Sequence, residues 1–346
     1  MEDKDELIKA QNEVIGILFE VIKKLQENID LQEEGVQLII KSKDDNLEEN
    51  KVRLDKITEE RNSNSEIISR LLKKLSFGLT LSLLTMTSAQ AQRDFSDIEI
   101  IPHHVAGSFY YLEGAGGNIG LSVGEDGVVM IDDQFAPLTE KILAAIRQIN
   151  DGEIRFVINT HVHPDHTGGN ENLGKLGIVI LARDQVRVRL SQSSPKDALP
   201  ILTYSDAITI HLNDEEVFAF PVPPAHTDGD TFIHFRDSDV IHTGDVFRTT
   251  AFPVIDTNNG GTLNGTLQAL AILVGTAGPN TKIIPGHGVV SDRMDVMGFR
   301  DMIIDVADRV EEMVSQGMSY EEVFSANPTE ASVSYTHLTL PTILLV

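Results

Sequence analysis

Hydrophobic positions divide the chain into two regions of different periodicity. Residues 1–71 are rich in Glu, Lys and Asn, lack proline, and place apolar side chains three, four or seven positions apart. The clearest stripe comprises Ile8, Ile15, Phe19, Ile22, Leu25 and Ile29, and a second stretch runs through Leu47, Leu54 and Ile57. This spacing is typical of amphipathic helices. We therefore predict an acidic helical segment over residues 1–71, with its second stretch interrupted at residues 62–65.

From Phe95 onward the pattern changes to short apolar or alternating runs separated by Gly, Asp and Asn. These runs predict strands at 109–112, 120–123, 127–131, 155–159, 178–181, 209–212, 216–220, 231–235, 240–242 and 282–285. Longer helical patterns occupy 136–149, 170–176, 263–274, 293–316 and 320–326. Residues 184–204 are more polar, and we expect an irregular surface excursion over the site. Strand runs mixed with helices in two similar halves favour two sheets packed face to face with helices outside.

Residues 72–91 have the parts of a secretory signal peptide. Lys73 and Lys74 precede an apolar run over 75–87, and Ala89-Gln90-Ala91 resembles a cleavage site. If this signal is used, the native product starts near Leu72, residues 1–71 are non-native upstream sequence, and the protein is periplasmic or secreted. The alternative is a short buried helix that ends a genuine N-terminal domain in a cytoplasmic protein.

The last stretch, residues 332–346, does not continue the preceding pattern. It resembles translated sequencing-adapter tails, so we interpret it as non-native and give His337 no role. The expected organisation is therefore a helical segment (1–71), a signal-like segment (72–91), a globular domain (92–331) and a tail. If residues 1–71 are native, they are either a coiled-coil or partner helix through which chains associate, or a solvated helix without a role.

The composition of the chain limits the partners and metal ligands that we expect. The chain has 346 residues and a formal net charge of −25, and residues 92–346 carry 15 Lys and Arg against 35 Asp and Glu. A domain with this much negative charge repels phosphate backbones, so we do not expect nucleic acid as a partner. We expect a small-molecule substrate instead. The chain has no cysteine, so a metal must be held by imidazole and carboxylate groups. No run of about 18 apolar residues predicts a stable membrane span.

The largest concentration of possible metal ligands lies between Thr160 and Asn170. His161 and His163 are two positions apart at the end of a predicted strand, so their side chains point to the same face and can reach one ion. Pro164 ends the strand, and Asp165 and His166 follow at the turn into the next helix, where they can aim at a second position. Imidazole and carboxylate ligands without thiolate suit zinc, with manganese or iron as alternatives.

Three later residues are candidate partners of this motif. His226, Asp245 and His287 each follow a predicted strand, in a loop that contains Gly or Pro. Loops at strand ends, held by a rigid sheet, are where site residues collect. Neighbouring polar residues could orient the ligands or serve as ordinary turn and core residues; these are Asp132, Asp133, Asp228, His242 and the 258–261 loop. We interpret His103, His104 and His211 as structural or surface residues.

The motif His161-x-His163-x-Asp165-His166, followed by His226, Asp245 and His287, resembles the metallo-β-lactamase superfamily of metallohydrolases, over roughly residues 98–330. The resemblance implies an αββα sandwich with the site at the edge between the two sheets. It implies a first zinc held by His161, His163 and His226. It implies a second zinc held by Asp165, His166 and His287, with Asp245 bridging the two.

The same resemblance implies a mechanism. A hydroxide between two zinc ions would attack an ester, thioester, lactone or amide-type bond, while Asp165 orients it and shuttles a proton. Position 245 is Asp, whereas β-lactamase branches usually have Cys or Ser there, so a general hydrolase is favoured. A class B-like β-lactamase and an iron-dependent sulfur dioxygenase of the same fold remain as alternatives. His163 stands where the di-iron flavoprotein branch has a carboxylate, which disfavours redox chemistry.

Overall fold

The computed structural model describes Val21, residues 23–32, Glu34, and residues 47–86 and 94–330. The expectations for residues 1–20, 35–46 and 87–91 and for the tail at 332–346 lie outside these ranges. The chain divides into two compact units, Met1–Arg93 and Asp94–Val346.

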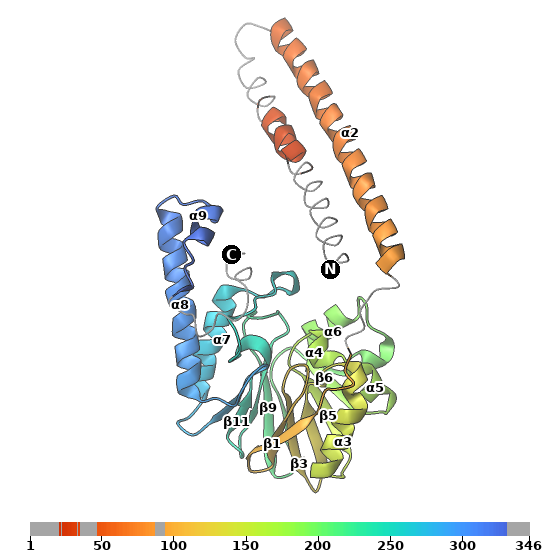
Figure 1. The fold of residues 1–346 in the computed structure, drawn as a ribbon, viewed down its shortest axis with the longest axis vertical. Coiled ribbons are helices and arrows are strands. Elements are labelled where there is room, and N and C mark those ends of the chain that lie inside the picture. The colour runs from red at the N-terminus through yellow and green to blue at the C-terminus, as the bar shows by residue number, and fades with distance from the viewer. Residues whose placement is uncertain (1–20, 22, 33, 35–46, 87–93, 331–346) are drawn as a thin grey trace. The chain divides into compact units, whose positions relative to one another are not determined.

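The first unit contains two helical stretches, residues 23–32 and α2 (Leu47–Met86) (Figure 1). They run antiparallel: Arg53 Nε donates to Glu34 at 2.7 Å, and Asn64 Nδ2 donates to Asn28 Oδ1 at 3.2 Å. The predicted interruption at residues 62–65 is wrong. The helix continues through Asn64 because its amide finds a partner on the facing helix. Among the described helices, none combines the length and apolarity that crossing a bilayer requires.

The second unit begins with a seven-stranded sheet in which strand order follows chain order. Its strands are β1 (Ile101–Ala106), β2 (Phe109–Glu113), β3 (Ile119–Gly124), β4 (Gly127–Ile131), β5 (Ile154–Asn159), β6 (Val179–Arg183) and β7 (Leu202–Tyr204). Strands β1 to β4 pair antiparallel, and β4 to β7 pair parallel. The change at β4 marks the point where hairpins give way to helical crossovers.

The other sheet has five strands in the order β12-β11-β10-β9-β8. They are β8 (Ile208–Leu212), β9 (Glu215–Pro221), β10 (Thr231–Phe235), β11 (Val240–His242) and β12 (Lys282–Ile284). All neighbours pair antiparallel except β11 and β12, which are parallel. The connection between these two parallel strands contains one long helix, α7 (Leu263–Thr276).

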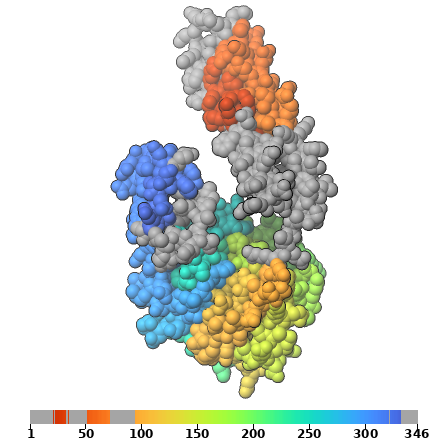
Figure 2. Space-filling model, in the orientation of Figure 1, coloured from red at the N-terminus to blue at the C-terminus, as the bar shows by residue number. Residues whose placement is uncertain are grey.

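Helices cover both outer faces, as the pattern predicted. The helices and 3₁₀ turns are η1 (Ala136–Leu138), α3 (Thr139–Ile149), α4 (Pro164–Thr167), α5 (Asn170–Lys175), α6 (Asp184–Leu190), η2 (Lys196–Ala198), η3 (Gly244–Val246), η4 (Thr257–Asn259), α7 (Leu263–Thr276), α8 (Arg293–Ser315) and α9 (Tyr320–Ser325). One apolar cluster joins α3 to the first sheet, and another joins α7 and α8 to the second. Figure 2 shows α8 and α9 (blue) forming the surface on one side of the unit.

A third apolar cluster lies between the sheets. Phe109 of β2 meets Phe235 of β10 with ring centroids 4.6 Å apart, and both side chains are fully buried. Burial of this apolar surface from both sheets holds them face to face. The order helix, sheet, sheet, helix confirms the predicted αββα sandwich preceded by helix.

Two sequence-based expectations need correction. Residues 184–204 are not irregular, since they form α6, η2 and β7. Val186 and Leu190 are buried one helical turn apart, while Val188 between them is 61% exposed. Strand β1 was not predicted, because none of its residues is buried at this sheet edge and they include Pro102. Proline is compatible with an edge strand, where its missing N–H costs no ladder bond.

Two pairs of parallel strands determine where the polar residues gather. Strands β4 and β5 end side by side, with the Asp132 amide donating to Ile158 O at 3.0 Å. Strands β11 and β12 do the same, with the Thr243 amide donating to Ile284 O at 3.0 Å. The carboxyl ends of parallel strands open at the same edge of a sheet. Each sheet therefore delivers polar loops to one edge of the sandwich.

Candidate metal centre

All seven residues predicted as ligands lie at this edge. Their side-chain atoms form three overlapping groups whose members are mutually within 4.8 Å. The groups are His161/His163/His226, His161/His166/Asp245 and Asp165/His166/His287. The first sheet contributes the four ligands of the central motif, and the second sheet contributes His226, Asp245 and His287. Both sheets are thus needed to complete the centre.

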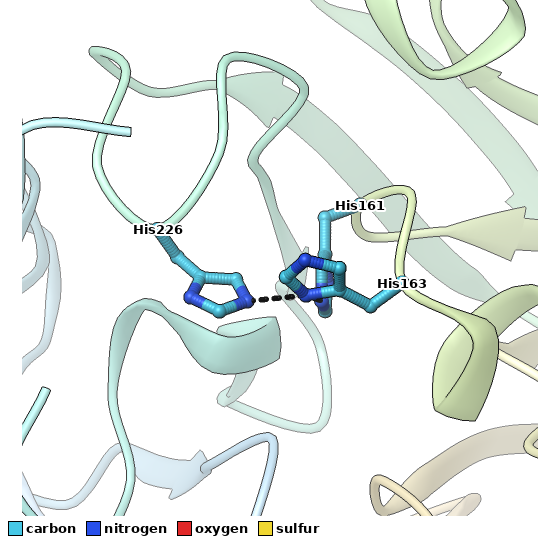
Figure 3. Close-up of side chains that lie close together, drawn as sticks. All are labelled: His161, His163 and His226. Atoms are coloured by element: carbon cyan, nitrogen blue, oxygen red, sulfur yellow. Dashed lines mark hydrogen bonds between the residues drawn. The ribbon is translucent and has the colours of Figure 1, made fainter. Parts of the chain in front are cut away.

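The first group consists of three imidazoles pointing at one another (Figure 3). His226 Nε2 lies 2.7 Å from His163 Nδ1, and His161 Nε2 lies 3.1 Å from the same atom. His161 and His163 come from the loop after β5, whereas His226 comes from the loop between β9 and β10. The spacing of two residues therefore aims both rings of the first loop at the third, as predicted.

The protons of these rings are on their far sides. His226 Nδ1 lies 2.6 Å from Val254 O, and His163 Nε2 lies 2.7 Å from Asp256 Oδ2. A carbonyl and a carboxylate can only accept, so both far nitrogens carry a proton, and in a neutral ring the inward nitrogen is then an acceptor. In neutral rings these two inward nitrogens, 2.7 Å apart, would both be acceptors, and a cation held between them would satisfy both. This arrangement fits a metal ion.

His161 also carries its proton on the nitrogen that faces away from the group. Its Nδ1 lies 3.0 Å from Thr160 Oγ1, which already donates its proton to Asp132 Oδ2 at 2.7 Å. His161 must then donate through Nδ1, which leaves its inward Nε2 free to accept. Burial lowers the pKa of His161 well below its usual value and lowers the pKa of His226 to about 4. Both rings are therefore neutral at physiological pH, as metal ligands must be.

We call the group Asp165/His166/His287 the second group, and it surrounds His166. Its Nε2 lies 3.1 Å from Asp245 Oδ1 without the geometry of a hydrogen bond, and both atoms are buried without a partner. Buried polar atoms normally have partners, so these two facing atoms fit a cation held between them. Burial alone would lower the pKa of His166, but Asp245 and Asp132 raise it well above its usual value. A metal would displace this proton.

Asp165 and His287 complete the second group. His287 Nε2 lies 3.1 Å from Asp165 Oδ2 and 3.3 Å from Asp245 Oδ2. Burial would raise the pKa of Asp165, but the hydrogen bond from His287 and the charge of His166 lower it to about 2. Asp165 is thus ionised at neutral pH, and its side chain is 27% exposed.

Asp245 lies between the two groups. Its carboxylate oxygens are 3.1 Å from His166, 3.3 Å from His287 and 3.8 Å from His226. Burial would raise the pKa of Asp245, but His166 and His287 hold it well below the usual range. It is therefore a fixed negative charge that reaches imidazoles of both groups.

Glycines leave the room that the ligands need. A Cβ on Gly117 would lie 2.1 Å from His166 Cε1, and one on Gly286 would lie 2.0 Å from Asp245 Oδ1. Neither contact is tolerable for real atoms. Gly117 precedes β3 and Gly286 follows β12, so the backbone of both sheets approaches the candidate ligands closely.

Asp132 supports the site from behind, which confirms one of the two interpretations of the Asp132-Asp133 pair. Its fully buried carboxylate accepts from Thr160 N, Thr160 Oγ1 and His166 Nδ1, all at 2.7 Å. It therefore fixes the ligand loop and the orientation of His166. Asp133 instead accepts from Gly169 N at 2.8 Å and contacts the helix that follows the motif.

The other candidate residues have different contacts. Asp228 pairs with Arg189, and His242 lies 2.9 Å from Asn118 O. His103 lies beside Glu113 and His104 beside Gly107 O, away from the centre, which agrees with a structural role. The sequence patterns did not reveal Asp256. It lies 93 positions from the His163 that it orients, and its local sequence is that of an ordinary turn.

The comparisons with known proteins bear on this geometry. A profile of the metallo-beta-lactamase superfamily matches residues 112–287, half of the chain and the whole span of the seven ligands. This chain belongs to the metallo-beta-lactamase superfamily. Members of the superfamily are generally metal-dependent hydrolases, and this chain is an enzyme of that class. A search of curated proteins returned no match.

Solved structures agree with the superfamily fold. A metallo-beta-lactamase from Pontibacter korlensis is 14% identical with a TM-score of 0.54, covering 60% of this chain and 100% of that one. The DIM-1 metallo-beta-lactamase is 16% identical with a TM-score of 0.53, covering 60% and 99%. A double mutant of the sec-alkyl sulfatase PisA1 is 16% identical with a TM-score of 0.55, covering 66% and 45%. At such identities the likeness concerns the fold alone.

Proposed function

We propose that this metallo-beta-lactamase superfamily enzyme is a dinuclear zinc hydrolase acting on an ester, thioester, lactone or amide-type bond of a small molecule. His161, His163 and His226 would hold the first ion. Asp165, His166 and His287 would hold the second, with Asp245 between them. The observation that carries this proposal is the convergence of three imidazole nitrogens in the first group, with His163 Nδ1 2.7 Å from His226 Nε2 and 3.1 Å from His161 Nε2. No thiolate is available, and imidazole with carboxylate suits zinc.

The chain's own residues supply positioning and proton transfer. When bound, the two ions would lower the pKa of a shared water and polarise the bond to be cleaved. Asp165 is ionised and partly exposed, so it can accept a proton from the attacking water and later return it to the leaving group. Asp245 keeps a negative charge between the groups. Asp132 and Asp256 hold the rings of His166 and His163.

Metal analysis of the purified protein tests the dinuclear proposal. We expect about two zinc ions per chain, with one lost in His161→Ala, because the deleted ring faces both other imidazoles of its group. His211→Ala is the matched control, since it removes an exposed histidine outside the centre. A wild-type chain that takes up no ion would contradict the proposal.

A substrate panel tests the chemistry. Zinc-loaded protein is assayed with a thioester, a lactone, nitrocefin and an alkyl sulfate, the last two because structures of the same fold include β-lactamases and a sec-alkyl sulfatase. Hydrolysis that disappears in Asp165→Asn but not in His211→Ala supports the proposal. Oxygen uptake with a persulfide by iron-loaded protein would instead favour a sulfur dioxygenase.

We also propose that residues 72–91 act as a secretory signal and that the working enzyme comprises residues 92–331 in the periplasm or outside the cell. Two lysines, an apolar run and an Ala-Gln-Ala end support this. Mass spectrometry of the protein secreted by its native host decides the matter. A mature chain that retains residues before Leu72 would contradict it.

A further inference from the structure

One loop, residues 254–261, orients two of the three imidazoles of the first group. Val254 O accepts from His226 Nδ1 at 2.6 Å, and Asp256 Oδ2 accepts from His163 Nε2 at 2.7 Å. The Asp256 amide also donates to His226 O at 2.9 Å. A shift of this loop would therefore move both rings. Within residues 94–330, no hydrogen bond or ion pair links the loop to Asp165, His166 or His287.

The loop is fixed in turn by Arg189 of α6. The Arg189 Nε and Nη2 atoms donate to the two oxygens of Asp228 at 2.7 and 2.6 Å. Its Nη1 donates to Asn259 Oδ1 at 2.9 Å and to Asn258 O at 3.3 Å. A planar guanidinium with donors in a fixed fork suits this bidentate arrangement. Because every nitrogen of Arg189 has a protein acceptor, the side chain is poorly available to bind a substrate anion.

Asn259 carries the contact from Arg189 to the ligand. Its Oδ1 accepts from Arg189, while its Nδ2 and backbone amide donate to Asp256 at 2.7 and 3.0 Å. The opposite orientation of the amide would place donor against donor and acceptor against acceptor. The donor and the acceptor are therefore determined at each hydrogen bond of the series Arg189–Asn259–Asp256–His163. Gly260, at φ +79°, closes the turn beside Asp228 and Arg189.

We propose that Arg189 is a positioning residue of the first metal group: it holds the 254–261 loop, and through Asn259 and Asp256 it aims His163. The inference rests on the proposed metal-binding function and adds to it a residue that orients one of the ligands. The second group depends on Asp132, which contacts none of these residues. Loss of Arg189 should therefore weaken one ion and spare the other. A residue with a merely structural role would affect both or neither.

Stepwise zinc titration of the full chain against a chromophoric chelator tests this. His226→Ala and His287→Ala identify which step belongs to each group. In Arg189→Gln we expect affinity at the first group to fall about 10-fold or more, within the range for residues that orient ligands, with the second group unchanged. Arg189→Lys should recover part of the loss, because it restores the charge but not the fork. Arg187→Gln, on the same helix but donating to Pro200 O, is the matched control.

A double-mutant cycle tests the route. If Arg189 acts through Asp256, then Arg189→Gln should add little to the loss already seen in Asp256→Asn. The inference is overturned if Arg189→Gln weakens both groups equally or neither, or if the two losses are additive. A wild-type chain that binds a single ion at the first group would contradict the dinuclear function, while Arg189→Gln would still decide the inference on that ion. A chain that binds none overturns both.

Discussion

At the scale of single residues, the centre depends on which nitrogen of each histidine faces inward. That choice is made by acceptors behind the rings: Val254 O for His226, Asp256 for His163 and Asp132 for His166. Each acceptor holds a proton on the far nitrogen and turns the near nitrogen toward the centre. The metal affinity of the site is therefore controlled by residues that would not touch the metal.

Asp132→Asn tests this control at the second group. The amide cannot accept from all three donors that now face Asp132, so at least one buried group loses its partner. We expect unfolding free energy to fall by about 1–3 kcal/mol and zinc affinity at the second group to fall about 10- to 100-fold. The backbone tolerates the change, because Asn readily adopts the positive φ of 61° found here. Chemical denaturation and zinc titration measure the two effects.

Asp133→Asn is the matched control, because it makes the same change at the next position. Asp133 contacts no ligand side chain, so zinc affinity should stay at the wild-type value. A loss equal to that of Asp132→Asn would show that the effect comes from damage to the turn. The contrast between adjacent residues isolates the hydrogen bonds to Thr160 and His166.

Asp133 also predicts a pH dependence. Burial raises the pKa of its carboxyl well above the usual value, and the nearby charge of Asp132 adds to this. The folded protein then retains a proton that the unfolded chain releases above about pH 4, so this residue lowers stability as pH rises. Asp133→Asn should therefore gain stability relative to wild type between about pH 4 and neutral pH. Parallel denaturation curves at several pH values measure the difference, and a constant difference would contradict the prediction.

Sequence reasoning named the candidate ligands and one residue that supports them, Asp132, but not Asp256. The histidines and Asp245 were found because ligand chemistry is confined to few residue types and because strand ends can be inferred from apolar runs. Asp256 could not be found in this way. Its role depends on a contact with His163 that only the folded chain creates, and Asp-Thr-Asn-Asn has the composition of any turn.

At the scale of elements, helix α8 shows how local rules operate away from the site. Asp292 accepts from Met294 N and Asp295 N and forms a capping box with Asp295. Such a cap satisfies amides that have no partner within the helix. Gly298, by contrast, is an exposed glycine in the helix interior, and a Cβ added there would meet no neighbouring atom within 4 Å.

Gly298→Ala should therefore stabilise the protein by about 0.5–1 kcal/mol, because alanine loses less backbone entropy in a helix. Zinc content should not change. Gly286→Ala is the informative counterpart: its Cβ would lie 2.0 Å from Asp245 Oδ1, so stability and zinc binding should both fall. Denaturant midpoints and metal analysis test the pair, and equal effects at both positions would contradict the prediction.

Most strands were predictable because their apolar runs are buried between layers. Strand β1 was not, because an edge strand with no buried residue has little apolar pattern. Helix α6 was missed because Val186, Val188 and Leu190 alternate with polar residues, which obscures the helical turn that buries only the first and third. In both cases the deciding contact is with a neighbouring element rather than within the segment.

At the scale of the whole molecule, the two units have separate interiors. The described interior of the helical unit includes Val21 and Ile57, whereas the sandwich has its own clusters on both sides of both sheets. A chain beginning at Gln92 should therefore fold, retain its zinc and keep kcat/KM within about twofold of the full chain. Size-exclusion chromatography, metal analysis and the substrate panel test this. An aggregated or metal-free product would show that the sandwich needs the helical unit.

The centre draws ligands from loops of both sheets, and this has a thermodynamic consequence. An unfolded chain has no such site, so bound zinc stabilises only the native state, by about 1.4 kcal/mol per ion for each tenfold excess of free zinc over the dissociation constant. The melting temperature should thus rise steadily with zinc, and excess chelator should abolish the rise. Calorimetry over a zinc series would measure it, and a flat response would contradict a centre shared between the sheets. The heat resistance of this protein would then report the zinc supply of the compartment in which it works.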